Sequence, residues 1–166
     1  MKDLIGEKIK SYSSNSRLWI FQSLSLLTNH EKEIISNRLN NFFDNWDAHG
    51  KILKSSSFFV YSNFLVVLVD SSEVTATGCS IDKLFNKIKE IGEKLNKNLI
   101  NNNFVAYKFN DSESINFLNL FDFKKKIRDK LILDCVVFDN SISNIEQFKK
   151  SWVINIEDWK KKYIKI

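Results

Sequence analysis

The stretch Phe58–Leu84, FFVYSNFLVVLVDSSEVTATGCSIDKL, decides the fold of this chain. It contains an unbroken apolar run, Phe64–Val69, which has no polar face to present to water. Such a strand is typical of the middle of a sheet that is covered by helices. Asp70 ends the run, and a polar loop then leads to Thr77-Gly78-Cys79-Ser80, where we expect a helix to begin. The pattern predicts a buried strand, a loop and a helix in succession.

Strand and helix patterns alternate on both sides of this stretch. Apolar runs predict further strands, at Arg17–Gln22, Ser55–Tyr61 and Phe104–Phe109. A capping box at Thr28–Glu31 predicts a helix. We expect that helix to end at His49-Gly50, where glycine suits the left-handed cap position. The helix that begins near Cys79 is expected to run to about Asn96, because its apolar residues recur at helical spacing.

The resulting order of strand, helix, strand, strand, helix, strand is that of the ferredoxin-like split βαβ fold. We therefore predict an α+β protein in which an antiparallel sheet carries two helices on one face. The predicted ferredoxin-like domain covers residues 17–110. Residues 1–16 are expected to form a loose lead-in, and residues 111–166 a C-terminal αβ extension that packs on the domain.

Composition is consistent with one domain but says little about partners. The 166 residues include 22 Lys, 3 Arg, 19 Asn and 19 Ile but no Pro, a bias that an AT-rich genome produces. The net charge of +5 is therefore a weak indication of a nucleic acid or an acidic membrane surface. Three arginines are few for a phosphate-reading cluster, so nucleic acid is the less expected partner. We expect a small anionic ligand or a protein partner, and no membrane.

The two cysteines, Cys79 and Cys135, lie in different contexts, so no disulfide is expected. The sequence has no C-x-x-C or H-x-x-x-H spacing, and we expect neither a metal nor another cofactor. It also has no signal peptide pattern and no apolar stretch of membrane-spanning length. The expected location is the cytoplasm.

In a split βαβ domain, the loops after the first helix and after the third strand lie at the same end of the sheet. This end should collect carboxylate, hydroxyl, thiol and imidazole side chains. They are Asp47, His49, Asp70, Glu73, Thr75, Thr77, Cys79 and Asp82.

Two functions fit this set of residues. The first is a binding module, in which the loop and the start of the helix hold an anion or a macromolecular partner. Its ligand-binding residues would be Thr75, Thr77, Gly78, Ser80 and Asp82. The alternative is an acyl-transfer enzyme or hydrolase with Cys79 as nucleophile, His49 as base and Asp70 as its orienter. Each of these three residues also has a structural interpretation, as a packed thiol, a helix end and a loop cap.

Several short runs of the sequence are the basis of a resemblance to one protein family. They are Arg17–Gln22, Trp46–Gly50, Val69-Asp70, Ala76–Asp82 and Val136–Asn140. These runs resemble a family of small uncharacterised bacterial proteins that carry the label "ABC transporter ATPase", and the TGCSID run is the most specific part. The chain contains neither a Walker A loop nor G-x-G-x-x-G, so the resemblance does not extend to ATPase motifs. Family members typically end in Ser-Trp-His. Here Asp158-Trp159-Lys160 takes that place, which leaves Trp159 as an expected packing anchor.

Overall fold

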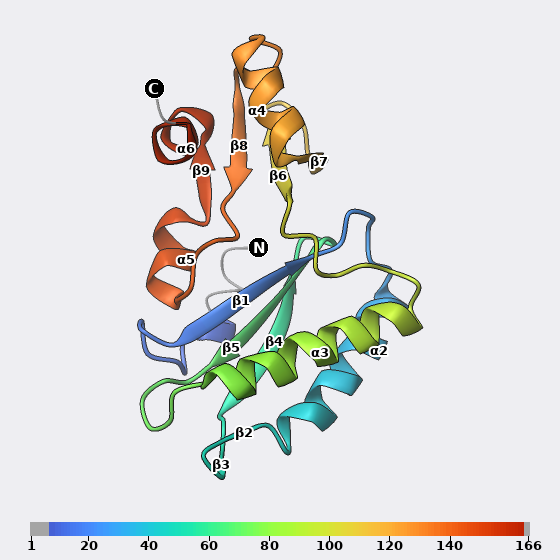
Figure 1. The fold of residues 1–166 in the computed structure, drawn as a ribbon, viewed down its shortest axis with the longest axis vertical. Helices are drawn as coiled ribbons and strands as arrows, with labels where there is room; N and C mark the ends of the chain where they lie inside the picture. Colours follow the sequence, from blue (N-terminus) through green and yellow to red (C-terminus); the bar gives the residue numbers. More distant parts are fainter. Residues whose placement is uncertain (1–6, 165–166) are drawn as a thin grey trace. The chain divides into compact units, whose positions relative to one another are not determined.

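The computed structural model describes residues 7–164 of an α+β protein (Figure 1). The chain divides into two compact units. Unit 1 contains the residues up to 101 together with 143–146, and unit 2 contains residues 102–142 and 147–166. The sheets of both units are antiparallel.

Unit 1 is built on a three-stranded sheet in the order β1-β5-β4. Its strands are β1 (Arg17–Gln22), β4 (Ser55–Val60) and β5 (Phe64–Val69). All six residues of β5 are buried, which confirms the prediction of a central strand. Arg17 pairs with Val69, so β1 begins where β5 ends. The loop after Val69 therefore leaves the sheet beside the start of β1.

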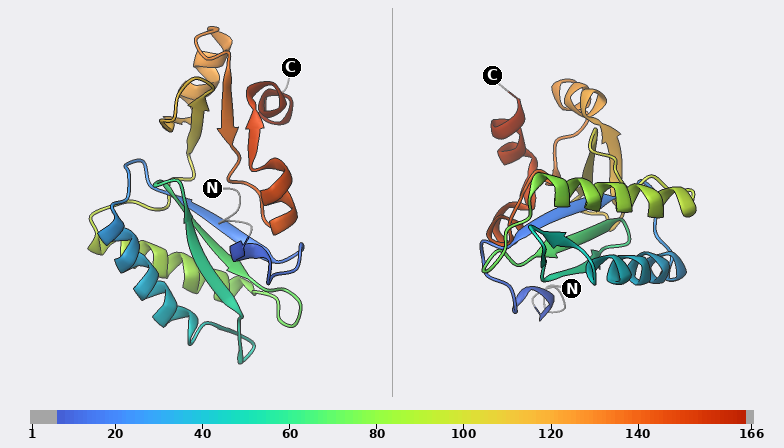
Figure 2. Two further views of the ribbon diagram at one scale, coloured as in Figure 1. Left: turned by 180° about the vertical axis from the view of Figure 1, so that it is seen from behind. Right: turned by 60° about the horizontal axis from the view of Figure 1, so that its bottom comes forward.

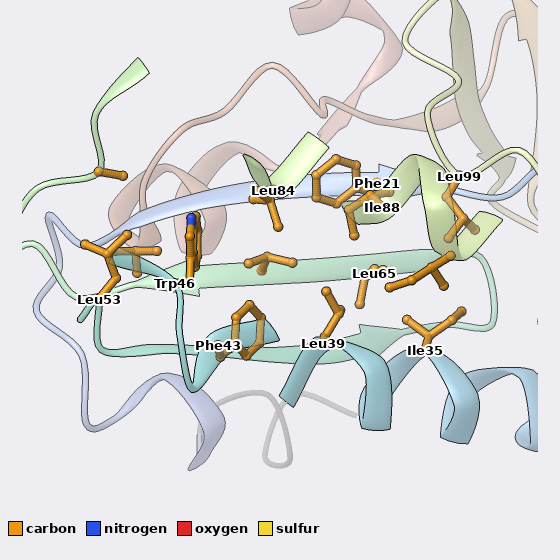
Figure 3. Close-up of a cluster of buried hydrophobic side chains, with 14 of the residues drawn as sticks. Phe21, Ile35, Leu39, Phe43, Trp46, Leu53, Leu65, Leu84, Ile88 and Leu99 are labelled. Atoms are coloured by element: carbon orange, nitrogen blue, oxygen red, sulfur yellow. The ribbon is translucent and has the colours of Figure 1, made fainter. Parts of the chain in front are cut away.

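Two helices, α2 (Asn29–Phe43) and α3 (Gly78–Lys94), pack on one face of this sheet (Figure 2). The core between them takes one stripe of side chains from each element (Figure 3). Ile35 and Leu39 come from α2, Leu84 and Ile88 from α3, and Leu65 from β5. The capping box at the start of α2 is present as predicted: the Glu31 amide donates to the Thr28 hydroxyl at 3.2 Å, and the Thr28 amide donates to the Glu31 carboxylate at 2.7 Å.

The predicted end of the first helix at His49-Gly50 is wrong, because α2 ends at Phe43. The chain turns inward there to bury Trp46 and continues as a short hairpin of β2 (Asp47–Ala48) and β3 (Lys51–Ile52). His49 and Gly50 form its turn, with φ angles of 53° and 76°. Two consecutive positive φ angles are the requirement of a type I′ turn, which explains the glycine.

The prediction that Phe104–Phe109 completes the ferredoxin-like sheet is also wrong. This segment, β6, lies in the four-stranded sheet of unit 2, in the order β7-β6-β8-β9. Its sheet partners there are β7 (Asn116–Asn119) and β8 (Cys135–Phe138), and β9 (Val153–Asn155) follows β8. The sheet of unit 1 is thus limited to β1, β5 and β4. Along the free edge of β1 runs the segment 143–145, where the Leu18 amide donates to the Ser143 carbonyl at 3.0 Å.

Aromatic packing explains why β6 belongs to unit 2. Tyr107 of β6 lies 5.1 Å from the ring of Phe123, and Phe123 lies 5.0 Å from the ring of Trp159. These rings come from α4 (Leu120–Arg128) and α6 (Ile156–Tyr163), which cover the same face of the sheet. Trp159 is thus a buried packing anchor, as expected. The helix α5 (Ile145–Ser151) begins at the segment that pairs with β1.

Part of the predicted loose lead-in is attached to unit 1. Ile9 is buried, and the Tyr12 hydroxyl donates to the Ser56 hydroxyl at 2.8 Å. Residues 1–6 lie outside the described part of the chain.

Gly92 should resist substitution, although it lies within a helix. A Cβ atom there would meet the Lys97 carbonyl oxygen at 2.5 Å, and that carbonyl belongs to the turn that ends α3. We expect Gly92→Ala to destabilise unit 1 by about 1–3 kcal/mol, as overpacking does. At Gly78 nothing lies within 4 Å of the added atom. Gly78→Ala should therefore stabilise the protein by up to about 1 kcal/mol, through helix propensity. Chemical denaturation of both variants tests this, and equal effects would contradict the packing argument.

Candidate functional site

The start of α3 is closed by a reciprocal cap. The Ser80 amide donates to the Thr77 hydroxyl at 3.4 Å, and the Thr77 amide donates to the Ser80 hydroxyl at 2.8 Å. The Ser80 hydroxyl also donates to the Thr77 carbonyl at 2.9 Å. Ser80 is buried. Two of the three hydroxyls that the sequence assigned to ligand binding, those of Thr77 and Ser80, are therefore used by the helix cap.

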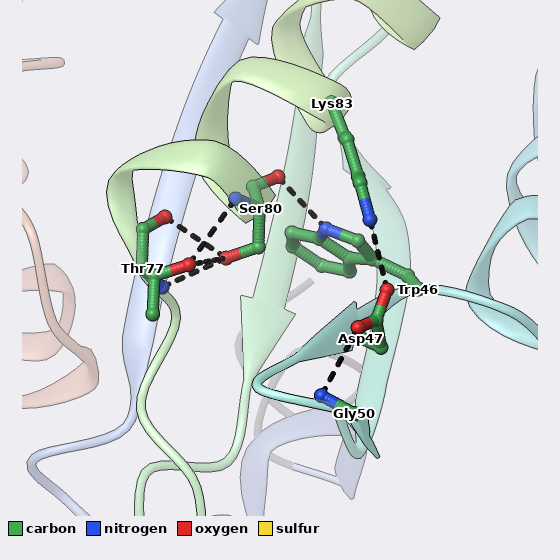
Figure 4. Close-up of polar contacts among 6 residues, drawn as sticks. All are labelled: Trp46, Asp47, Gly50, Thr77, Ser80 and Lys83. Carbon is green, nitrogen blue, oxygen red and sulfur yellow. Dashed lines mark hydrogen bonds and ion pairs between the residues drawn. The ribbon is translucent and has the colours of Figure 1, made fainter.

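Trp46 fixes this first turn against the rest of unit 1. Figure 4 shows that its indole N–H donates to the Ser80 carbonyl, at 2.8 Å. The Trp46 side chain is only 1% exposed. Nearby, Lys83 of α3 forms an ion pair of 2.9 Å with Asp47, which also accepts the Gly50 amide at 3.3 Å. These contacts bring the segment Trp46–Gly50 against the first turns of α3, although the two segments are about thirty residues apart in the sequence.

The cap leaves two amides at the helix start. The N–H groups of Gly78 and Cys79 make no hydrogen bond within residues 7–164, and both residues are exposed. No acidic side chain lies in the first turn of α3. Because the helix dipole is positive at this end, two free amides in a first turn that carries no acidic side chain favour a negatively charged group.

Arg17 lies at the end of the sheet from which the loop to α3 leaves, since it pairs with Val69, the last residue of β5. Its guanidinium group stands over the Trp19 ring at 5.3 Å, and the Trp19 ring lies 6.2 Å from Trp46. Cross-strand partners share a face, so Arg17 is on the side of the sheet that the helices cover. It has no carboxylate partner among the described residues. A chain of contacts thus runs from Arg17 through two indoles to the first turn of α3.

Asp70 is engaged by other groups. Its carboxylate accepts Lys54 at 2.8 Å, the Ser72 amide at 3.0 Å and the Ser16 hydroxyl at 3.5 Å. The hydrogen bond from Lys54 is the main reason why the pKa of Asp70 is lowered to about 2. A small cavity of about 90 Å³ lies beside this ion pair and is also lined by Ile52, Glu73 and Val74. Asp70 therefore acts as an anchor of the loop.

The other predicted residues are placed as follows. His49, Thr75, Cys79 and Asp82 are exposed. Within the described part of the chain, no hydrogen bond joins His49 to Cys79 or to Asp70, so the hydrogen bonds of a Cys-His-Asp triad are not formed. Both cysteines are free, and burial raises the pKa of the Cys135 thiol to about 11. Residues 7–164 contain no group of three or more side chains that could hold a metal ion.

The sequence interpretation missed Arg17 and Lys83 and gave Trp46 only a packing role. The i, i+3 and i+4 spacing of the first helix did include Trp46 among buried residues. However, its contact with Ser80 depends on the break after Phe43, which spacing does not reveal. The signal that was available for Arg17 was its place directly before four consecutive apolar residues of the strand, 18–21.

The ion pair of Asp70 predicts a pH dependence. A carboxyl whose pKa is lowered in the folded state stabilises the fold above its ordinary pKa of about 4, and this contribution is lost as the pH falls through its folded value. We expect the stability difference between the wild type and Asp70→Asn to be constant above about pH 5 and to shrink toward pH 2. Glu90 also has a pKa of about 2, so the comparison with the variant isolates Asp70. A difference that is independent of pH would contradict the assignment.

Comparisons with known proteins add no constraint: no family model, no curated protein and no solved structure matches this chain. Among residues 7–164, none of the helices combines the length and the apolar character that crossing a membrane requires.

Proposed function

We propose that unit 1 is a cytoplasmic binding module that takes a small anionic group, such as a phosphate or a carboxylate, at the N-terminus of α3. The observation that carries this proposal is that only some of the backbone amides in the first turn are hydrogen-bonded. The cap satisfies the Ser80 amide and leaves those of Gly78 and Cys79 facing solvent. Amides at a helix start bind anions well when the helix is held in place. Here Trp46 holds it, through its hydrogen bond to Ser80.

Arg17 supports the same proposal through charge. Its guanidinium group has no carboxylate to neutralise it in the described part of the chain, and it is oriented by the Trp19 ring. Guanidinium groups bind phosphate and carboxylate in a bidentate manner, and stacking on an aromatic ring reduces the freedom that binding would remove. The TGCSID run, on which the family resemblance depends most, forms the first turn of this helix.

The two cysteines provide a direct test. Cys79 is exposed beside the proposed site, whereas Cys135 is buried. Iodoacetamide should therefore label only Cys79 in the native protein. We expect inorganic phosphate to slow this labelling in a saturable manner, and chloride at equal ionic strength to leave the rate unchanged. The rate would be followed by mass spectrometry of the intact chain.

Two variants make the test specific. Arg17→Gln should weaken the protection by phosphate about tenfold, as expected for the loss of one charge-assisted contact. Arg38→Gln is the matched control, because Arg38 already has a carboxylate partner in Glu90, at 3.8 Å, and it should behave as the wild type. If phosphate protects Cys79 equally in both variants, or does not protect it in the wild type, the proposed anion site at the start of α3 is wrong.

The alternative enzyme has one observation in its favour, which is an exposed thiol next to two free amides that could stabilise an oxyanion. It ranks second because Asp70 is engaged by Lys54 and not by His49. As an activated nucleophile, Cys79 should react with iodoacetamide at neutral pH much faster than free cysteine does. A rate equal to that of free cysteine would exclude this alternative and leave the binding module unaffected.

A further inference from the structure

The helix α4 in unit 2 differs from the rest of the chain in its charge. Residues 124–130 contain four lysines and one arginine against a single aspartate. The five cations are Lys124, Lys125, Lys126, Arg128 and Lys130. None of them forms an ion pair within residues 7–164. In α6 of the same unit, by contrast, Lys160, Lys161 and Lys162 each have a carboxylate partner, at 2.9, 3.1 and 2.7 Å.

Exposed apolar side chains lie at both ends of this basic segment. Phe121, in the first turn of α4, is 71% exposed. Leu131 and Leu133, just after the helix, are 67% and 62% exposed. These side chains are among the most exposed large apolar groups of the described chain. A partner should therefore offer both negative charge and an apolar phase.

Helix geometry places Phe121 and three of the cations together. Phe121, Lys124, Lys125 and Arg128 follow the i, i+3, i+4 and i+7 spacing of one helix flank, which we call the α4 flank. The core side of α4 is formed by Phe123 and Ile127, which are buried. Asp122 lies off the α4 flank and is hydrogen-bonded to Asn119, and Asp129 caps the C-terminal end. The α4 flank therefore carries an aromatic ring and three cations without an acid among them.

We propose that the α4 flank, together with Leu131 and Leu133, binds the surface of a membrane that contains anionic lipids. Lys and Arg side chains would lie among the headgroups, and Phe121 and the two leucines would enter the boundary with the acyl chains. Charge complementarity supports an anionic partner, and the exposed leucines favour lipid over nucleic acid. Bases can stack on Phe121, but they offer no place for two aliphatic side chains. The proposal concerns unit 2 and is independent of the anion site in unit 1.

Sedimentation of the full chain with vesicles tests this proposal. We expect it to sediment with vesicles of phosphatidylcholine and phosphatidylserine but not with phosphatidylcholine alone. Binding should weaken as salt is added, because screening reduces the contribution of the cations. Phe121→Ser should lower the affinity about tenfold, and the double variant Lys125→Gln/Arg128→Gln by a similar factor. These side chains are exposed, so the variants should retain the circular dichroism spectrum of the wild type.

Lys161→Gln is the matched control, since it removes an exposed lysine that is already paired with Asp158, and it should bind as the wild type. The proposal is overturned if the chain binds neither kind of vesicle or binds both equally. It is also overturned if Phe121→Ser and the double variant bind like the wild type. Tight binding of a single-stranded RNA oligonucleotide without vesicle binding would assign the α4 flank to nucleic acid instead.

Discussion

Replacing Trp46 with alanine should destabilise unit 1 by about 3–5 kcal/mol, the range observed when a fully buried large aromatic side chain is truncated. The reason is that Trp46 fills the core and also makes a buried hydrogen bond. Its ring is stacked on Phe43 at 5.8 Å and lies 5.3 Å from Phe42, while its N–H donates to Ser80. Hydrogen exchange of the β5 amides measures the loss in unit 1 alone, which matters because a chain of two units need not unfold in one step.

Trp46→Phe separates the two contributions. It retains most of the apolar volume but removes the indole N–H, so we expect a loss of about 1–2 kcal/mol. It should also release the first turn of α3, and protection of Cys79 by phosphate should weaken. A Trp46→Phe variant with unchanged stability and unchanged protection would show that the hydrogen bond to Ser80 does not position the site.

Asp139→Ala should be the most damaging change of a charged side chain in unit 2, at about 2–3 kcal/mol. The Asp139 carboxylate is 4% exposed and accepts hydrogen bonds from Ser141, Tyr163 and Lys162 at 2.7, 2.8 and 2.7 Å. Two of these donors belong to α6, so the carboxylate ties that helix to the end of β8. Exchange of the α6 amides should accelerate in this variant.

The exposed pair Lys161–Asp158 provides the comparison. Its side chains are 76% and 52% exposed, and Lys161→Ala should change stability by only a few tenths of a kcal/mol, roughly, as surface pairs do.

Burial opposes the charged form of Asp139, but hydrogen bonds from Lys162, Ser141 and Tyr163 outweigh it and lower the pKa of the carboxyl. Its stabilising effect is therefore present at neutral pH and lost in acid, as the pH falls through the lowered pKa. Similar losses for the two variants would contradict the anchoring role.

The local elements could largely be predicted from the sequence. The apolar run Phe64–Val69 and the helical spacing after Cys79 each indicate one structure, because burial and periodicity act within a few residues. Sheet membership could not be predicted in the same way. Phe104–Phe109 has the character of a strand in either unit, and the choice depends on aromatic partners, such as Phe123 and Trp159, that come later in the chain.

The sequence predicted that the segment around His49 and the start of the second long helix lie close together, but not which of their groups are used in hydrogen bonds. Placing His49-Gly50 and Thr77-Ser80 at one end required only the order of the first three strands. Which groups remain free for a ligand depends on hydrogen bonds. Thr77 and Ser80 satisfy each other, and Asp70 is held by Lys54. The sequence would give the same prediction even if every hydroxyl were available to a ligand. Only the structure shows that the free donors are backbone amides.

The most direct measurement is a titration of the isotope-labelled chain with inorganic phosphate, followed by amide NMR. We expect the resonances of Gly78 and Cys79 to shift in a saturable manner, and we expect Arg17→Gln but not Arg38→Gln to weaken this response about tenfold. Shifts that are confined to the lysines and amides of unit 2, or that leave Gly78 and Cys79 unchanged at saturating phosphate, would contradict an anion site at the start of α3.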